Sequence, residues 1–297
     1  MHWTLFLLPQ GIYILEIHVF PDFDYAVIHF AGLNKLSVKV YRSHCFYYDH
    51  NIAGTINLLK VMAAHECKKL QFMDHLRTHP AQRSFLSFRT IHMAEPSLWL
   101  RRYAVIYTGQ ILSGESFYLG TSTRLGLTPV DTLVKDPRGV PNNLMPYVQQ
   151  VAVGRRPSVT IFGNNYATKD GTGVRDYIHV LDLAEGHIAA LWKLFDSSSN
   201  IGCEPYNLGT GKGTSVLEIV NAFEKASGKK IPLFIGQRRP GDAEILFAGT
   251  GKAERELNWK AKYGITEMCR DQWNWASKNP YGYGSPDSTK QNGSNSH

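Results

Sequence analysis

The most informative absence in this sequence of 297 residues is a glycine-rich loop, because neither Gly-x-Gly-x-x-Gly nor Gly-x-x-Gly-x-x-Gly occurs anywhere in it. Such a loop lets the backbone approach a dinucleotide pyrophosphate at the N-terminus of a helix. Residues 1–22, where a first strand and its loop would be expected, match no known motif. The chain as written therefore has no segment that could cradle a dinucleotide in the usual way.

Long apolar runs, metal-type cysteine spacing and basic runs are also absent. The apolar first twenty residues are interrupted by Pro9 and Glu16 and carry no basic segment, so we expect no signal peptide and no membrane span. The formal net charge is +7. Because no basic run with interleaved aromatic residues occurs, this charge favours a phosphorylated small molecule over nucleic acid.

Cysteine is scarce, and its spacing is not that of a metal site. The four cysteines are Cys45, Cys67, Cys203 and Cys269. Residues so far apart indicate free thiols in a reducing compartment and no metal centre. We therefore expect a soluble, cytoplasmic protein.

With 43% hydrophobic residues, the chain can bury one large or two modest α/β domains. Residues 24–33 predict a buried parallel strand that ends in the small-residue turn Phe30-Ala31-Gly32, a site for ligand contact. A helix with one buried face is expected from Asn51, and a further strand from Lys68. This order of elements favours an α/β fold.

The segment from Gly171 to His187 is the most specific part of the sequence. It combines a two-glycine turn, the planar cation of Arg175, and Asp182 three residues before Glu185, as at a helix start. A loop, a strand and a capped helix with a structural Arg–Asp pair are the plain alternative. The segment resembles the one that leads into the nucleotide-sugar site of UDP-glucose 4-epimerases, which belong to the extended short-chain dehydrogenases.

Two further segments of the predicted substrate part carry the same resemblance. Asn142-Asn143-Leu144 resembles the family's Asn-Asn-Leu site, where side-chain and backbone groups meet the diphosphate and the sugar. An asparagine-capped helix with Leu144 in the core is the alternative, and both can hold together. A short strand is expected over 158–163 and contains Thr160, Ile161 and Phe162. In the resemblance, Phe162 corresponds to the aromatic residue whose ring stacks on the uracil. Plain core packing is the alternative for Phe162.

The loop from Arg238 to Asp242 resembles the family's Arg-x-Gly-Asp, in which the arginine, here Arg239, binds the diphosphate and the aspartate a ribose hydroxyl. A solvated turn with a surface Arg–Asp pair is the alternative. Nearby, Ser215 and Glu218 predict a capping box for a helix that ends near Gly228.

The resemblance implies an incomplete NAD(P)-binding Rossmann domain plus a smaller mixed α/β substrate domain. It also implies a transient NAD-dependent oxidation at sugar C4, rotation of the 4-keto sugar and hydride return, which interconverts UDP-glucose and UDP-galactose. NAD would contact Phe30, Ala31 and Gly32, and the family suggests a homodimer. Relatives that act on other UDP-sugars share most of these motifs, so the sugar stays open.

The family's catalytic Tyr-x-x-x-Lys is absent, so we assign no catalytic residue. That spacing places both side chains on one helix face, where the ammonium lowers the tyrosine pKa. Asn34 also stands where the family usually has lysine. We expect the chain as written to be inactive and not to retain NAD. The alternative is a non-catalytic nucleotide-sugar-binding remnant or a pseudogene product.

Two blocks, residues 35–46 and 73–135, resemble the family only in a shifted reading frame. When each new codon takes the last base of one codon and the first two of the next, His92 to Ser97 can give Tyr-Gly-Arg-Thr-Lys. Residues 73–86 can give Gly-Ser-Pro-Lys-Asp-Ala-Ser-Cys-Thr-Glu-Glu-Phe-Pro in the same way. Agreement over so many positions is not chance, because most residues fix the first two bases of their codon. A shifted frame keeps no designed periodicity, so we expect no regular element over 73–134.

These arguments divide the chain into four parts. We expect an unmatched N-terminus over 1–22, a damaged Rossmann domain over 23–135, a nucleotide-sugar-binding part over 136–284 and a disordered tail over 285–297. Relative to the family, the N-terminus is expected to be truncated.

Overall fold

The computed structural model describes residues 2–7, 13–18, 25–29, 54–64, 69–74, 87–92, 140–141, 143–196, 203–239 and 242–282. The chain forms two compact units, which are described separately below. The first unit comprises Met1–Phe117, Leu181–Gly211 and Ala248–Ala261. The second comprises Tyr118–Val180, Lys212–Phe247 and Lys262–His297.

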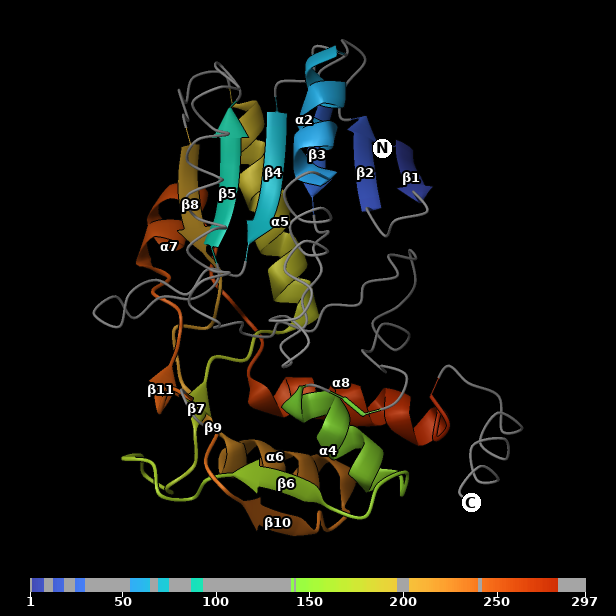
Figure 1. Cartoon of the computed structure of the whole chain (residues 1–297), viewed down its shortest axis with the longest axis vertical. Helices are drawn as coiled ribbons and strands as arrows, with labels where there is room; N and C mark the ends of the chain where they lie inside the picture. Colours follow the sequence, from blue (N-terminus) through green and yellow to red (C-terminus); the bar gives the residue numbers. More distant parts are fainter. Residues whose placement is uncertain are drawn as a thin grey trace. The chain divides into compact units, whose positions relative to one another are not determined.

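The first unit is built on a mixed sheet whose described strands run in the order β1-β2-β3-β4-β5-β8 (Figure 1). The strands are β1 (His2–Leu7), β2 (Tyr13–His18), β3 (Tyr25–His29), β4 (Lys69–Asp74), β5 (Ser87–His92) and β8 (Cys203–Asn207). β3 and β4 are parallel and are connected through α2 (Gly54–Ala64), whereas the other neighbours are antiparallel. The expected strand–helix–strand order and the α/β class are confirmed.

β5 corrects one expectation, because it lies in the block where we predicted no regular element. Its register pairs Phe88 with Met73 of β4 on one side and with Tyr206 of β8 on the other. A strand with backbone partners on both edges needs little hydrophobic pattern of its own, and phenylalanine, threonine and isoleucine all favour strands. The prediction was therefore wrong for Ser87–His92. β1 and β2 were not expected either.

Helix α5 (Val180–Phe195) packs closely against other elements of the first unit. Gln71 of β4 donates a hydrogen bond of 3.1 Å to a backbone carbonyl of α5. A Cβ on Gly186 would lie 2.2 Å from the side chain of Leu208 and 3.1 Å from that of Trp259. Glycine is thus needed where α5 meets these two buried side chains. The last helix of this unit, α7 (Gly251–Leu257), contacts β8.

The second unit combines three helices with two small sheets (Figure 1). The helices are α4 (Leu144–Ala152), α6 (Val216–Ser227) and α8 (Ile265–Lys278). β6 (Val159–Phe162) pairs in parallel with β10 (Leu233–Gly236), and β7 (Val174–Arg175) lies between β9 (Thr214–Ser215) and β11 (Ile245–Leu246). Val148, Val159, Phe223 and Cys269 belong to one buried cluster that joins the three helices to β6.

The start and end of α6 were predicted from local sequence and are confirmed. The Ser215 side chain accepts a hydrogen bond from the Glu218 backbone N–H, and Glu218 accepts one from the Ser215 backbone N–H. Gly228 ends the helix in the left-handed region, with φ of 65°. Within the described residues, no helix is long and apolar enough to cross a bilayer.

Candidate functional site

The segment singled out in the sequence forms a tight loop that leads into β7. Gly171 has φ of 76°, and a Cβ there would lie 2.2 Å from the Asn164 carbonyl oxygen, so only glycine fits. A Cβ on Gly173 would come no closer than 3.6 Å to Arg175. The tight backbone path therefore depends on the first of the two glycines.

Asp170 holds this loop against the N-terminus of α6. Its Oδ1 accepts hydrogen bonds from the backbone N–H (2.9 Å) and hydroxyl (2.7 Å) of Thr172. Its Oδ2 accepts one from the Ser215 hydroxyl. Burial alone would raise the pKa of Asp170, but the hydrogen bonds from Ser215 and Thr172 lower it overall. The carboxylate thus fixes the chain just before Arg175.

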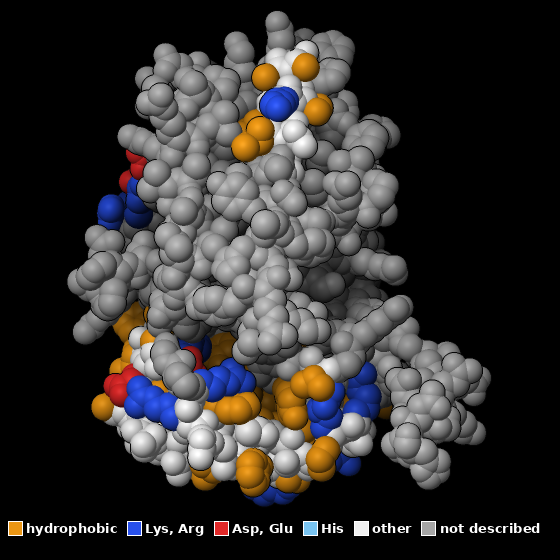
Figure 2. Space-filling model, viewed as in Figure 1, with side chains coloured by type: hydrophobic (Ala, Val, Ile, Leu, Met, Phe, Trp, Pro, Cys, Tyr) orange, Lys and Arg blue, Asp and Glu red, His pale blue; other side chains and the backbone are white. Residues whose placement is uncertain are grey.

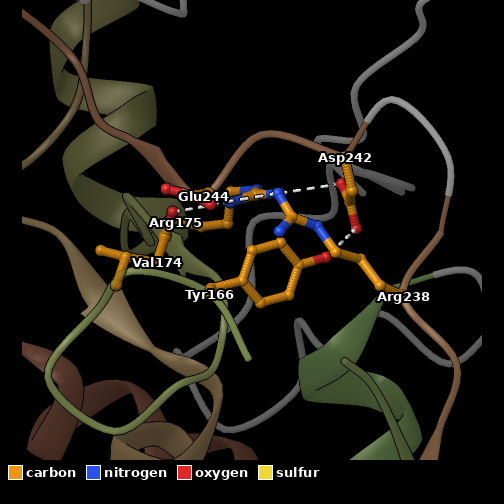
Figure 3. A network of polar contacts seen from close by, with 6 residues as sticks. All are labelled: Tyr166, Val174, Arg175, Arg238, Asp242 and Glu244. Atoms are coloured by element: carbon orange, nitrogen blue, oxygen red, sulfur yellow. Dashed lines mark hydrogen bonds and ion pairs between the residues drawn. The ribbon is translucent and has the colours of Figure 1, made fainter. Parts of the chain in front are cut away.

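Arg175 and Asp242, 67 residues apart in sequence, form a half-buried ion pair (Figure 3). Arg175 Nη2 lies 2.9 Å from Asp242 Oδ1, and their side chains are 22% and 24% exposed. Arg175 Nη1 donates to the Val174 carbonyl at 2.8 Å. The Tyr166 hydroxyl donates to the other carboxylate oxygen of Asp242 at 3.4 Å. Two residues that were predicted separately as substrate contacts therefore pair with each other, with a tyrosine as third member.

Two consecutive arginines lie over two aromatic rings. The Arg238 guanidinium lies 4.0 Å from the ring centre of Tyr166, and that of Arg239 lies 3.6 Å from the ring centre of Phe162. Arg238 also pairs with Glu244 at 3.2 Å. Phe162 is 39% exposed, so it is not simply a core residue. On the face shown in Figure 2, the lysine and arginine side chains of the described surface are interspersed with hydrophobic ones.

Four of the predicted site residues thus form two contacting pairs, Arg175 with Asp242 and Arg239 with Phe162. The Asp242 backbone N–H links the pairs by donating to the Arg239 carbonyl at 3.3 Å. Such a set offers guanidinium groups for phosphate oxygens, an aromatic face for a planar base and a carboxylate for hydroxyl groups.

The other predicted substrate contacts have varied positions. Ile161 is buried at 3% exposure, and Thr160 is its half-buried neighbour on β6. Asn143 is the N-cap residue of α4 but makes no side-chain capping hydrogen bond, and Leu144 packs against the core cluster of this unit. Asn142 and the predicted cofactor contacts lie outside the described residues, the latter being Phe30, Ala31 and Gly32.

Sequence reasoning missed the contribution of Tyr166 and Arg238. Tyr166 follows Phe162 by four residues and Arg238 precedes Arg239, so each stands close to a residue that was predicted. Neither carries a motif of its own, and only the fold brings Tyr166 to Asp242, 76 residues away.

The histidines of this region have structural partners, as expected. A ring nitrogen of His187 lies 2.7 Å from the Leu183 carbonyl oxygen, and burial lowers the pKa of His187 to about 4. His179 is buried and pairs with Asp271 at 3.2 Å. Among the described residues, no group of three or more metal-ligating side chains occurs.

Comparison with known proteins identifies the family. A family model described as GDP-mannose 4,6 dehydratase matches residues 131–272. UDP-glucose 4-epimerase 4 of Oryza sativa subsp. japonica is 62% identical over 274 residues, which cover 90% of this chain and 73% of that protein. The chain belongs to the UDP-glucose 4-epimerase family.

Solved structures of UDP-glucose 4-epimerases have the same fold. The enzyme from Stenotrophomonas maltophila, with bound NAD and formylated UDP-arabinopyranose, gives a TM-score of 0.64 at 35% identity and covers 85% of this chain and 76% of its own. The enzyme from Bifidobacterium longum, in complex with NAD⁺ and UDP, gives a TM-score of 0.62 at 36% identity. This match covers 88% of this chain and 78% of the Bifidobacterium enzyme. The expected Rossmann-type class is thereby confirmed, and both of these related structures hold NAD.

The described part of this epimerase relative does not fit NAD. The sequence has no glycine-rich loop. Accordingly, none of the described strands is joined to a following helix by such a loop. Within the described sheet, the one parallel pair is β3 and β4, and β3 has an antiparallel neighbour, β2, on its other side. We therefore derive no catalytic step through the cofactor.

Proposed function

We propose that the second unit binds the uridine diphosphate end of a UDP-sugar. In this proposal the uracil stacks on Phe162, Arg175 and Arg239 hold the diphosphate, and Asp242 accepts a hydrogen bond from a ribose hydroxyl. The observation that carries the proposal is the Arg175–Asp242 ion pair at 2.9 Å together with the Arg239–Phe162 stack at 3.6 Å, which are linked because the Asp242 backbone N–H donates to the Arg239 carbonyl at 3.3 Å. Asn142, Asn143, Leu144, Thr160 and Ile161 remain proposed contacts on the family resemblance alone.

Calorimetric titration of the full chain with UDP tests the proposal. A charge-assisted hydrogen bond contributes about 1.5–3 kcal/mol to binding. Arg175→Ala and Arg239→Ala are therefore each expected to lower the affinity for UDP by roughly 10- to 100-fold. Arg270→Ala is the matched control, because Arg270 pairs with Asp271 on α8 and its side chain is 57% exposed. Absence of any UDP binding by the parent chain would refute the site.

We further propose that the chain as written does not interconvert UDP-glucose and UDP-galactose. It lacks both members of Tyr-x-x-x-Lys, and loss of a positioned general base alone costs about 10²–10⁴-fold in rate. A coupled assay with UDP-galactose, with the rice relative as positive control, should detect no turnover. NAD is expected to be absent after purification, which absorbance and acid release would measure. Turnover or stoichiometric NAD would contradict these proposals.

The sugar and the cellular setting are finer proposals. UDP-glucose is favoured by the names of the relatives, whereas UDP-galactose, galactose metabolism and a cytoplasmic setting are proposed on the family resemblance alone. Another UDP-sugar is the alternative, since one solved relative holds a formylated UDP-arabinopyranose. Competition of UDP-glucose, UDP-xylose and UDP-arabinopyranose for the UDP site would rank them. A homodimer is proposed on the family resemblance, and sedimentation velocity would test it.

The reading-frame hypothesis explains why the family's catalytic motif is missing. The family model begins to match at residue 131, close to residue 136 where we place the return to frame. Resequencing of the transcript should reveal insertions or deletions that flank residues 35–46 and 73–135. Codons over 73–135 that fail to spell an epimerase in the shifted frame would show the hypothesis to be wrong. The chain would then be a diverged family member.

A further inference from the structure

Asp242 is held at both of its carboxylate oxygens, by two donors of different charge (Figure 3). Arg175 binds Oδ1 at 2.9 Å, and the Tyr166 hydroxyl donates to Oδ2 at 3.4 Å. A carboxylate fixed in this way has its free lone pairs pointing in set directions. The question is which donor keeps it fixed once a ligand is bound.

The inference rests on the proposed uridine diphosphate site. There, Arg175 is one of the two cations for the diphosphate, and a phosphate competes with Asp242 for the same guanidinium. Asp242 would lose part or all of this anchor when the diphosphate binds. Its second anchor is a neutral hydroxyl, which attracts a carboxylate without competing for the phosphate.

Tyr166 is itself firmly placed. Its side chain is 5% exposed, and its backbone N–H donates to the Gly171 carbonyl at 3.0 Å, which ties it to the glycine loop. A Cβ on Gly163 would lie 2.9 Å from the tyrosine ring, so the glycine makes room for it. The Arg238 guanidinium covers the ring at 4.0 Å. These contacts hold the hydroxyl at Asp242 independently of Arg175.

The hydroxyl also stays protonated. Burial, together with the negative charge of Asp242, raises the pKa of Tyr166 above its ordinary value of 10.0. At neutral pH it is therefore a donor to the carboxylate and never a competing anion.

We propose that Tyr166 is the positioning residue of Asp242: it keeps the carboxylate aimed at the ribose hydroxyls when Arg175 turns to the diphosphate. Tyr166 thereby contributes to selection of a ribonucleotide without touching it. The variant that separates this role from packing is Tyr166→Phe, which keeps the ring and the stacking of Arg238 but removes the hydroxyl.

The test is calorimetry on the full chain with two probes, UDP and 2′,3′-dideoxyuridine diphosphate. Tyr166→Phe should weaken UDP by about 3- to 10-fold, the range for one lost hydrogen bond, and leave the dideoxy probe unchanged. In an Asp242→Ala background, Tyr166→Phe should have no further effect on UDP. Tyr281→Phe, at a tyrosine that is 50% exposed, is the matched control.

Equal weakening of both probes would mean a packing role and would overturn the inference, as would additive effects of the two substitutions. Unchanged binding of both probes would overturn it too. A parent chain that binds neither probe would remove the uridine diphosphate site itself, and this inference with it. A parent that binds UDP but in which Tyr166→Phe changes the affinities for the two probes by the same factor overturns the inference alone.

Discussion

Asp170→Asn should lower the unfolding free energy, because it removes one of the hydrogen bonds by which Asp170 holds the loop that carries Arg175. The asparagine amide oxygen can still accept from Thr172, but its NH₂ group cannot accept the hydrogen bond from the Ser215 hydroxyl. A hydrogen bond to a charged group contributes about 1.5–3 kcal/mol. A loss of roughly 2 kcal/mol corresponds to about 4–8 °C in Tm for a domain of this size.

Thermal unfolding followed by circular dichroism measures this loss, and pH provides a second check. Because hydrogen bonds lower the pKa of Asp170 below 3.8, its contribution is present above pH 3.8 and is lost as the pH falls through the folded pKa. The difference between parent and variant should therefore shrink below that pH. Glu204→Gln is the control, since Glu204 and Lys252 form an exposed pair, 48% and 32% exposed, that should contribute less than about 1 kcal/mol. Equal Tm values for the two variants, or a difference that persists in acid, would refute the reasoning.

Three other predictions concern single residues. Gly171→Ala should lower Tm clearly more than Gly228→Ala. Both glycines have positive φ, 76° and 65°, but an added Cβ would clash only at Gly171, where it would lie 2.2 Å from the Asn164 carbonyl oxygen. Equal effects would show that the contact does not matter. Because burial lowers the pKa of His187 to about 4, the unfolding free energy should fall by up to about 1.4 kcal/mol per pH unit from pH 6.5 to 4, and His187→Gln should flatten this slope in denaturant titrations. Burial raises the pKa of Cys269 to about 12, so mass spectrometry should find this thiol labelled slowly at pH 8 until denaturant is added; fast labelling of the folded chain would contradict its burial.

Local signals predicted the elements that depend on a few neighbouring residues. The Ser215–Glu218 capping box and the glycine at position 228 placed both ends of α6, because each motif satisfies backbone groups within one turn. The parallel strand β3 and the helix after it followed from hydrophobic spacing in the same way. Helix α5 begins at Val180, so that Asp182, which was expected at the helix start, lies in its first turn.

Contacts between distant segments could not be predicted from periodicity. β7, β9 and β11 have two residues each, which is too short for any hydrophobic pattern, and their pairing exists only in the fold. For the candidate site, the family resemblance predicted Phe162, Arg175, Arg239 and Asp242. Tyr166 was found only because the fold places its hydroxyl at Asp242.

The chain's compact units and its expected reading-frame boundary are different divisions of the sequence. Residues 181–211 and 248–261, which lie in the part expected to be in frame, belong to the first unit. They supply β8, which pairs with β5, and α5, whose Leu183, Leu191 and Leu194 are at most 8% exposed. A fragment over residues 136–284 would leave β8 without its sheet neighbour and these leucines without the strands of the first unit, at a cost of about 1.5–3 kcal/mol for each side chain that becomes exposed. Because such a fragment could fail to bind UDP merely by misfolding, the residues proposed to hold UDP have to be tested in the full chain.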